Sequence, residues 1–518
     1  MLFNSLEFGI FLPITLLLYW YLFGGTSKKQ NLFLLITSWF FYAWWDWRFL
    51  GLLIFAGITS YLSAVSISKN NAIPRARIIW LLFGILTNLC VLFTFKYYDF
   101  FVSSFASAFL GGDDSGLLLN LILPVGISFY SFQAIGYCVD VFRNNVPAEK
   151  NFLLHLTFIS FFPQLLAGPI GRAQNLIPQF KQTRTFDSQL ATDGLRQILW
   201  GLFKKMVVAD NCAAVVNSVW GNGIETAGAS TLVGVAILYS FQIYGDFSGY
   251  SDMAIGTAKL FGIRLGDNFL FPYFSRNPQE FWRRWHISLN EWLRDIIYIP
   301  LGGSRNGKAK TLRNLFVVFS LSGLWHGASW TFVAWGIFHW LLFIPRTIFK
   351  VKQKPSEIVA KNKIFPNFVE VREMALTFSA ITVGWVFFRA DTIQDSFSFL
   401  KNCFRPSILS APEFSGTPFI FIGIMLLVEW LQRQGTHGLF KMPALPRALL
   451  WTCYICSFLS YSKMMECRKT LSILSFNLYH EQIVLEKSLF RKTTLICVHI
   501  LHRLLLRSRY RNMEDANT

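Results

Sequence analysis

The sequence predicts an all-α polytopic membrane protein with about 10–13 transmembrane or re-entrant helices. Of its 518 residues, 53% are hydrophobic, 17% are aromatic and only 15% are charged. Soluble domains carry roughly 25% charged residues, and the mean hydropathy of this chain is +0.41. This composition excludes disordered, coiled-coil and ordinary soluble proteins. Helices are favoured over a barrel, because barrels show only weak alternating segments.

Apolar runs along the chain give the predicted helices. A helix needs about 20 apolar residues to cross the hydrocarbon core of a bilayer. Runs of this kind cover 6–24, 31–45, 48–67, 78–96, 117–141, 152–168, 195–220, 228–245, 250–264, 312–326, 328–348, 371–389, 415–432 and 447–462. Several runs are short for a full crossing, so we expect some of them to be re-entrant.

The distribution of basic residues predicts the orientation. Lys28 and Lys29 follow the first run, and no Lys or Arg lies between Tyr97 and Phe142. Basic residues collect in cytoplasmic loops, so the N-terminus is predicted to lie outside. The net charge of +19 then reflects these loops and anionic lipid headgroups, and no nucleic-acid partner is predicted. No metal site is predicted either, because the Cys453–Cys456 pair has no second pair beside it.

Residues 161–169 form the first polar interruption of the apolar sequence. Pro163, Gly168 and Pro169 would break a helix in or near the bilayer. Irregular backbone at that depth must be buried in protein or line a cavity. A simple kink in one helix explains the segment equally well.

The second interruption, residues 242–252, carries Asp246, Ser248 and Asp252 between two predicted helices. It is interpreted either as the wall of a site or as a solvent loop. The two carboxylates are six residues apart and do not share a helix face. They are therefore not expected to form an acid–base pair.

The third interruption, residues 281–305, alternates aromatic residues with arginine. One interpretation is an interfacial helix with Trp at headgroup depth and Arg in water. The other is a cytoplasmic cation cluster that binds an anionic substrate such as a phosphate. The cations proposed for such binding are Arg283, Arg284, Arg294 and Arg305.

His326 is the polar residue that most strongly suggests chemistry. Arg313 lies 13 residues before it in the sequence, which is about 20 Å in a helix. His326 is therefore predicted to lie deep in the bilayer, where a histidine needs a hydrogen bond or a wet cavity. If one helix continued to His339, the two rings would lie on different faces.

These motifs resemble the membrane-bound O-acyltransferase (MBOAT) family, in its alginate O-acetylation branch, with teichoic acid D-alanylation as a cousin. The resemblance covers about residues 1–435 and lies in 123–130, 161–169, 246–252, 281–303, 325–327 and 384–390. It implies a ring of tilted helices around a central tunnel. It also implies that His326 is the catalytic histidine and that His286 is a second functional histidine. The motif residues carried over to the tunnel are Trp325, Gly327, Asp246, Ser248, Asp252 and Pro169.

The resemblance further implies a membrane O-acyltransferase in the bacterial cytoplasmic (inner) membrane. Its acyl donor would be a cytoplasmic thioester, acetyl-CoA, which is a co-substrate and not a bound cofactor. Its partners would be the lipid bilayer, periplasmic acetyltransferase proteins and a polysaccharide acceptor. Three alternatives stay open: transfer of D-alanyl or longer acyl groups, a transporter without chemistry, and a non-catalytic scaffold of an export complex.

The chain divides into a transferase domain over 1–462 and an atypical basic tail over 463–518. Trp451 is the last tryptophan, and four of the eight cysteines follow it. One hypothesis is a frameshifted reading of the tail. The other is a divergent amphipathic segment that lies on the cytoplasmic membrane surface.

Overall fold

The computed structural model confirms an all-α membrane protein. Every regular element within the described part of the chain is a helix. The described part comprises all residues except 110–115, 222, 350–357, 362 and 441–518. The predicted helix over 447–462 and the predicted tail over 463–518 fall outside it.

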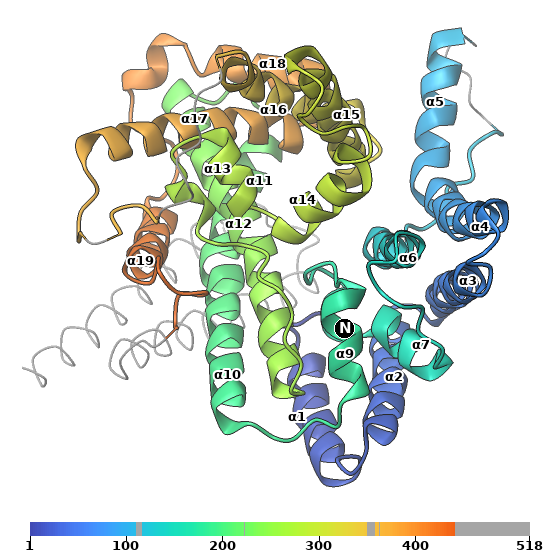
Figure 1. The fold of residues 1–518 in the computed structure, drawn as a ribbon. Helices are drawn as coiled ribbons and strands as arrows, with labels where there is room; N and C mark the ends of the chain where they lie inside the picture. Colours follow the sequence, from blue (N-terminus) through green and yellow to red (C-terminus); the bar gives the residue numbers. More distant parts are fainter. Residues whose placement is uncertain (110–115, 222, 350–357, 362, 441–518) are drawn as a thin grey trace, which may run out of the picture.

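The first half of the chain contains helices that range from the four residues of α8 to the 32 residues of α12 (Figure 1). They are α1 Leu6–Tyr21, α2 Ser27–Ala43, α3 Leu50–Lys69, α4 Pro74–Leu92, α5 Tyr98–Phe109, α6 Ile127–Phe142, α7 Phe152–Ser160, α8 Phe162–Leu165, α9 Ala173–Lys181, α10 Ser188–Leu202, α11 Asp210–Gly221 and α12 Ala229–Leu260. The predicted start of a helix at 117 is wrong, because residues 116–126 are not helical and α6 begins after Gly126 in a left-handed conformation (φ 78°).

The second half contains the helices on either side of His286 and His326. They are α13 Pro278–Arg284, α14 Ile287–Leu293, α15 Lys308–His326, α16 Trp330–Ile348, α17 Phe368–Arg389, α18 Ile393–Asn402 and α19 Thr417–Leu431. In Figure 1, α13–α18 gather at one end of the molecule, whereas α1 and α2 lie at the other end. The helices α10 and α12 run side by side between them.

Four helical stretches are long and apolar enough to cross a membrane: Trp47–Lys69, Pro74–Phe109, Trp330–Ile348 and Phe368–Arg389. Two shorter apolar helices, α1 and α19, accompany them. Only 17% of the apolar window in Pro74–Phe109 is buried inside the protein, so its outer side chains are placed to face lipid. Other predicted runs are shorter or carry polar side chains that face the protein interior. The apolar runs alone therefore suggest more full crossings than the described helices show by length and composition.

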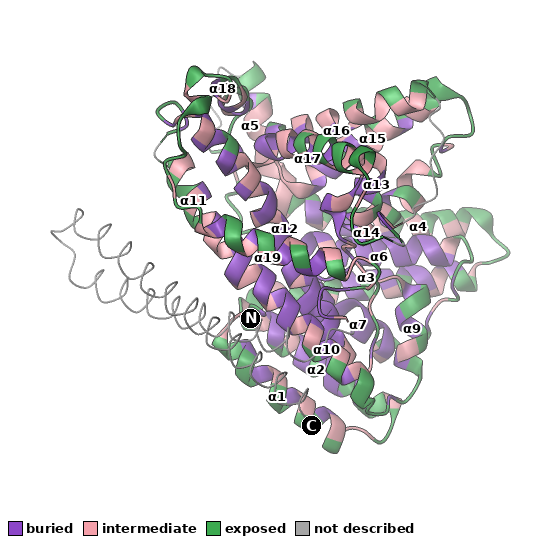
Figure 2. Cartoon of the chain, turned by 90° about the vertical axis from the view of Figure 1, so that its left-hand side faces the viewer, coloured by how far each residue is buried: buried purple, intermediate pink, exposed green. Residues whose placement is uncertain are grey.

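Two hydrophobic clusters hold the helices together, visible as the buried interior in Figure 2. The first joins α1–α4 and α6–α9 to the second half of α12 and to α14, and it includes Trp325. The second joins α10, the first half of α12 and α13 to α16, α17 and α19, and it includes Trp335. Because Trp325 and Trp335 flank the turn after α15, the turn lies where the two clusters meet.

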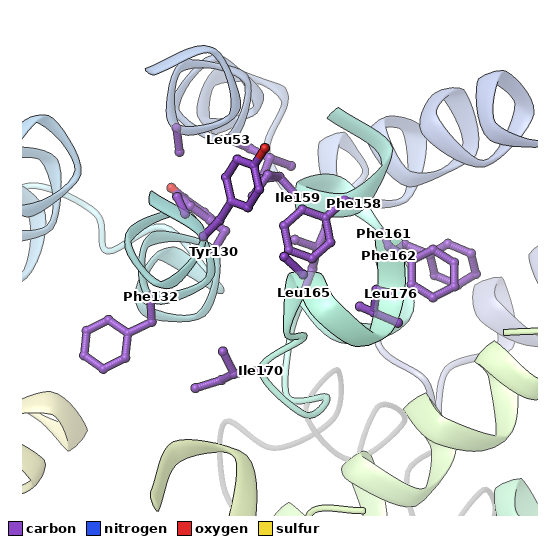
Figure 3. Close-up of a cluster of buried hydrophobic side chains, with 14 of the residues drawn as sticks. Leu53, Tyr130, Phe132, Phe158, Ile159, Phe161, Phe162, Leu165, Ile170 and Leu176 are labelled. Carbon is purple, nitrogen blue, oxygen red and sulfur yellow. The ribbon is translucent and has the colours of Figure 1, made fainter. Parts of the chain in front are cut away.

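Residues 161–169 break the helix as the sequence predicts. Helix α7 ends at Ser160, α8 is a single turn, and Pro169 is buried in the irregular segment that follows. Figure 3 shows Phe158, Phe161, Phe162 and Leu165 packed in a hydrophobic cluster with Tyr130 of α6 and Leu176 of α9. The irregular backbone is therefore buried in protein, which is the first of the two environments allowed at membrane depth.

The expected interruption at residues 242–252 does not exist. Helix α12 continues unbroken for 32 residues from Ala229 to Leu260, so neither the loop nor the two separate helices over 228–245 and 250–264 form. Glycine explains this result, because α12 packs against α10 backbone to backbone. A Cβ on Gly245 would lie 2.7 Å from the carbonyl oxygen of Lys204, and one on Gly249 would lie 2.7 Å from that of Gly201. These glycines allow close packing instead of ending the helix.

Candidate functional site

His326 is the last residue of α15, at the turn into α16. The helix is continuous from Lys308, which confirms the helical path from the basic residues to His326. Gly327 then reverses the chain in an extended conformation, and a Cβ there would lie 2.1 Å from the ring of Phe332. The hydroxyl of Ser329 caps the new helix by accepting from the backbone N–H of Thr331 at 3.3 Å. Small residues are therefore required beside His326 because the two helices turn so tightly.

Aromatic rings surround the imidazole of His326. Ring centroids lie 4.9 Å away for Trp325, 5.0 Å for Trp335 and 5.1 Å for Phe388, all close to perpendicular. The Nε2 atom is buried and has no hydrogen-bond partner among the described residues. This nitrogen is thus held among aromatic rings and is available to a substrate atom.

His286 lies at the break between α13 and α14, so the predicted interfacial helix is in fact two short helices. Its backbone is left-handed (φ 46°), an uncommon conformation for a residue other than glycine. Its Nδ1 lies 3.2 Å from the side-chain oxygen of Asn268, which also accepts from Ser288. The ring is buried, and its centroid lies 5.5 Å from that of Trp325. Trp325 therefore separates the two histidines that the sequence proposes for function.

His339 also approaches this site. In a single continuous helix it would lie on a different face from His326, but no such helix forms, because the chain turns at Gly327 and α16 folds back along α15. The centroid of the Trp335 ring lies 4.8 Å from that of His339 and 5.0 Å from that of His326. His339 is fully buried, and a Cβ on Gly384 of α17 would lie 2.9 Å from its Nε2 atom.

Several polar atoms in this aromatic cluster are buried without a partner in the described part of the chain. Buried polar groups are normally hydrogen-bonded, and each unsatisfied one costs about 1–3 kcal/mol. Those in the cluster are Nε2 of His286 and His326, both ring nitrogens of His339, and the indole nitrogens of Trp282, Trp325 and Trp335. They give the cluster a polar interior within an apolar wall, which is suited to a small polar group of a substrate.

A cavity of about 420 Å³ lies beside the histidine cluster, and two of the four arginines predicted to bind the donor line it. Arg283 and Arg294 line it, together with one carboxylate, Glu291. Trp282 and Phe319 line the same cavity and contact the ring of His339, at 5.0 and 6.3 Å between centroids. The basic cavity and the histidine cluster thus share a wall.

The other two predicted donor-site arginines lie elsewhere. Arg284 is engaged by Glu280 at 2.9 Å, and Arg276 holds the same carboxylate at 3.0 Å. Burial alone would raise the pKa of Glu280, but the hydrogen bonds and charges of these two arginines outweigh it and hold that pKa below its usual value. Arg305 is exposed in the loop before α15 and does not line the cavity.

Asp246, Ser248 and Asp252 lie at the interface of α12 with α10 and α11. The carboxylate of Asp252 pairs with Lys204 at 2.6 Å, and Lys204 also donates to the hydroxyl of Ser248. Asp246 pairs with Lys205, likewise at 2.6 Å. Ser248 and Asp252 thus share Lys204, and Asp246 pairs with the next lysine; these contacts are with neighbouring helical segments and not with the histidine cluster. Pro169, in contrast, lies close to the histidine cluster in space, because the N–H of the next residue, Ile170, donates to the hydroxyl of Ser288 at 3.0 Å.

Lys96 is a contact of the site that the sequence analysis did not single out. Its ammonium donates to the carbonyl oxygen of Trp325 and, at 3.1 Å, to the hydroxyl of Ser128. It lies in a π-helical segment, Phe93–Tyr97, between α4 and α5. Two more such segments, Phe203–Ala209 and Arg294–Tyr298, carry Lys204, Lys205 and Arg294. The sequence signal that could have identified Lys96 is a cation within an apolar run, because charged residues at membrane depth are usually functional. The structure adds that these cations lie in π-helical segments, which are frequent at functional sites.

Several known proteins have sequences similar to this chain. The profile of the MBOAT, membrane-bound O-acyltransferase family matches residues 147–383. A protein named "Probable alginate O-acetylase AlgI" from Pseudomonas syringae pv. tomato is 40% identical over 397 residues, 76% of this chain and 73% of that protein. The peptidoglycan O-acetyltransferase of Helicobacter pylori is 35% identical over 436 residues, 78% of this chain and 79% of that protein.

A more distant similarity extends to amino-acyl transfer. The teichoic acid D-alanyltransferase of Bacillus subtilis is 27% identical over 289 residues, 52% of this chain and 69% of that protein. The matched residues 147–383 include His286, His326 and the helices between them. With its helical membrane architecture and these relatives, the chain belongs to the membrane-bound O-acyltransferase family and is an O-acyltransferase.

Proposed function

We propose that this enzyme moves an acetyl group from acetyl-CoA in the cytoplasm towards a hydroxyl group of an exported polysaccharide. The observation that carries the proposal is the buried Nε2 of His326, which has no hydrogen-bond partner among the described residues, with His286 on the other side of the Trp325 ring. Relatives named for O-acetylation of alginate and of peptidoglycan support an acetyl donor and a polysaccharide acceptor. Alginate is the acceptor that the relatives at 40% identity favour.

The chemistry needs one base. An alcohol is a poor nucleophile near neutral pH, so His326 accepts its proton at Nε2 as its oxygen attacks the thioester carbonyl carbon. The tetrahedral intermediate collapses with cleavage of the C–S bond. The proton on His326 passes to the departing thiolate, which leaves as free CoA. His286, held by Asn268, and the indole N–H groups of Trp325 and Trp335 line the space in which this occurs.

The basic cavity is proposed to bind the phosphates of the donor. Arg283 and Arg294 line it, and its wall is shared with the histidine cluster. A donor held there would have its charged end at the arginines and its thioester end towards the rings. Arg305 and Arg284 are assigned no direct contact in this arrangement.

Replacing Arg283 or Arg294 with glutamine is expected to raise the KM for acetyl-CoA about tenfold, with a smaller change in kcat. The reason is the loss of a charge-assisted contact made equally in the bound donor and in the transition state. The measurement is the initial rate of thiol release from acetyl-CoA by protein reconstituted in liposomes, at two salt concentrations. Arg305→Gln is the matched control and should keep its KM. An equal rise in KM for Arg305→Gln would show that only general surface charge attracts the donor.

The proposed function is tested with purified protein, labelled acetyl-CoA and alginate oligosaccharide. Transfer of label to protein or glycan, with release of CoA, supports it. A mixture of acetyl, longer acyl and D-alanyl donors, analysed by mass spectrometry, identifies the group that is transferred. Wild-type protein that consumes no thioester would favour the transporter or scaffold alternatives.

Location and partners follow from the same proposal. The protein is a membrane protein, and the lipid bilayer is its environment. We place it in the cytoplasmic membrane, with the donor inside and the polysaccharide outside. Periplasmic acetyltransferase proteins would then complete transfer to the polymer.

A further inference from the structure

Lys96, in the π-helical segment after α4, contacts the C-terminal end of α15, the helix that carries His326. Its ammonium donates to the carbonyl oxygen of Trp325, the peptide group that joins Trp325 to His326. It also lies 5.6 Å from the centroid of the Trp325 ring. Both of its hydrogen-bond acceptors, the Trp325 carbonyl and the Ser128 hydroxyl, are uncharged oxygens. These contacts therefore solvate the charge of Lys96 and do not neutralise it.

The neighbouring residue, Tyr97, makes a comparable contact without a charge. Its hydroxyl donates to the carbonyl oxygen of Leu324 at 2.9 Å. The last carbonyl groups of a helix have no partner within the helix. Consecutive residues of one π-helical segment, Lys96 and Tyr97, thus cap consecutive carbonyls at the end of α15.

A charge at this position has a specific electrostatic effect. The C-terminal end of a helix carries a partial negative charge of about half an electron. His326 is the last residue of α15, so a negative tetrahedral intermediate beside it would be repelled by the helix end. A lysine ammonium on the Trp325 carbonyl opposes that repulsion, and its effect is larger at this partly buried position than in bulk water.

We propose that Lys96 is a positioning residue of the acyl-transfer centre and that its positive charge, in addition to its hydrogen bonds, is needed at the end of α15. A charged group at membrane depth is costly and is expected to serve function. The inference rests on the proposed acyl transfer at His326, because the anion that needs the charge is the intermediate of that reaction.

Three variants separate charge from capping. Lys96→Gln keeps a hydrogen-bond donor without charge and is expected to lower kcat at least about tenfold, with little change in KM for the donor. Lys96→Arg keeps the charge and should retain kcat within about threefold of wild type. Tyr97→Phe removes the neighbouring neutral cap and should also stay within about threefold, because it removes no charge.

The measurement is steady-state acetyl transfer by each reconstituted variant, normalised to folded protein by size-exclusion chromatography and thermal unfolding. Lys96→Gln with wild-type kcat would overturn the inference, since capping alone would then suffice. Folded Lys96→Arg that is as slow as Lys96→Gln would also overturn it. Wild-type protein without transfer would instead refute the proposed function, and the role of Lys96 with it.

Discussion

His326→Ala is expected to lower acyl transfer by at least about 10²–10⁴-fold, the range by which a positioned general base accelerates a reaction. The variant removes the buried Nε2 at the end of α15 and replaces it with a methyl group that cannot accept a proton. The acceptor hydroxyl would then have to attack without a base. Because the proposed donor site in the basic cavity does not include this ring, KM for acetyl-CoA should change little.

The measurement is acetylation in cells and in liposomes, with equal amounts of inserted protein. His155→Gln is the matched control, since His155 is also a buried histidine but its Nε2 is paired with the hydroxyl of Ser60 at 2.9 Å. It should retain transfer per folded molecule. Full acetylation by a well-inserted His326→Ala variant would refute the catalytic role. An inactive variant that still binds the proposed periplasmic partners would exclude loss of assembly as the cause.

Gly249→Val is expected to destabilise the protein severely, which is the second large effect. A Cβ on Gly249 would lie 2.7 Å from the carbonyl oxygen of Gly201, and one on Gly201 would lie 2.5 Å from that of Gly249. Both contacts are with backbone, which cannot move aside as a flexible side chain can. Overpacking in a well-packed interior costs typically about 1–3 kcal/mol and occasionally more. Separation of α12 from α10 would also weaken the buried pair of Lys204 with Asp252.

The readout is the yield of monodisperse protein and its thermal unfolding in detergent. Gly249→Ala should lower the melting temperature less than Gly249→Val does. Gly423→Ala, in the interior of α19, is the matched control, because no atom lies within 4 Å of a Cβ there. That change should be neutral or slightly stabilising, as alanine is favoured over glycine in helices. A folded and stable Gly249→Val variant would show that α10 and α12 are not packed this closely.

Sequence patterns were enough to predict the membrane class, the helical fold, the break at residues 161–169 and the helix from the basic residues to His326. Each depends on local composition: apolar content, proline position and the length of a run. His286 and His326 could be proposed from their motifs. The Trp325 ring separates these two histidines, and His339 approaches them because the chain turns tightly at Gly327. Sequence periodicity does not predict such a tight turn.

Tertiary structure alone decided the partners of the polar residues. Asp246 and Asp252 interrupt an apolar run, but lysines on the facing helix pair with them, and α12 therefore continues through them. Lys96 ends an apolar run in the sequence, but a π-helical segment turns it towards the carbonyl of Trp325, 229 residues away in the chain. The physical reason is that the role of a charge at membrane depth depends on the group that solvates or pairs with it, and that group is usually distant in sequence.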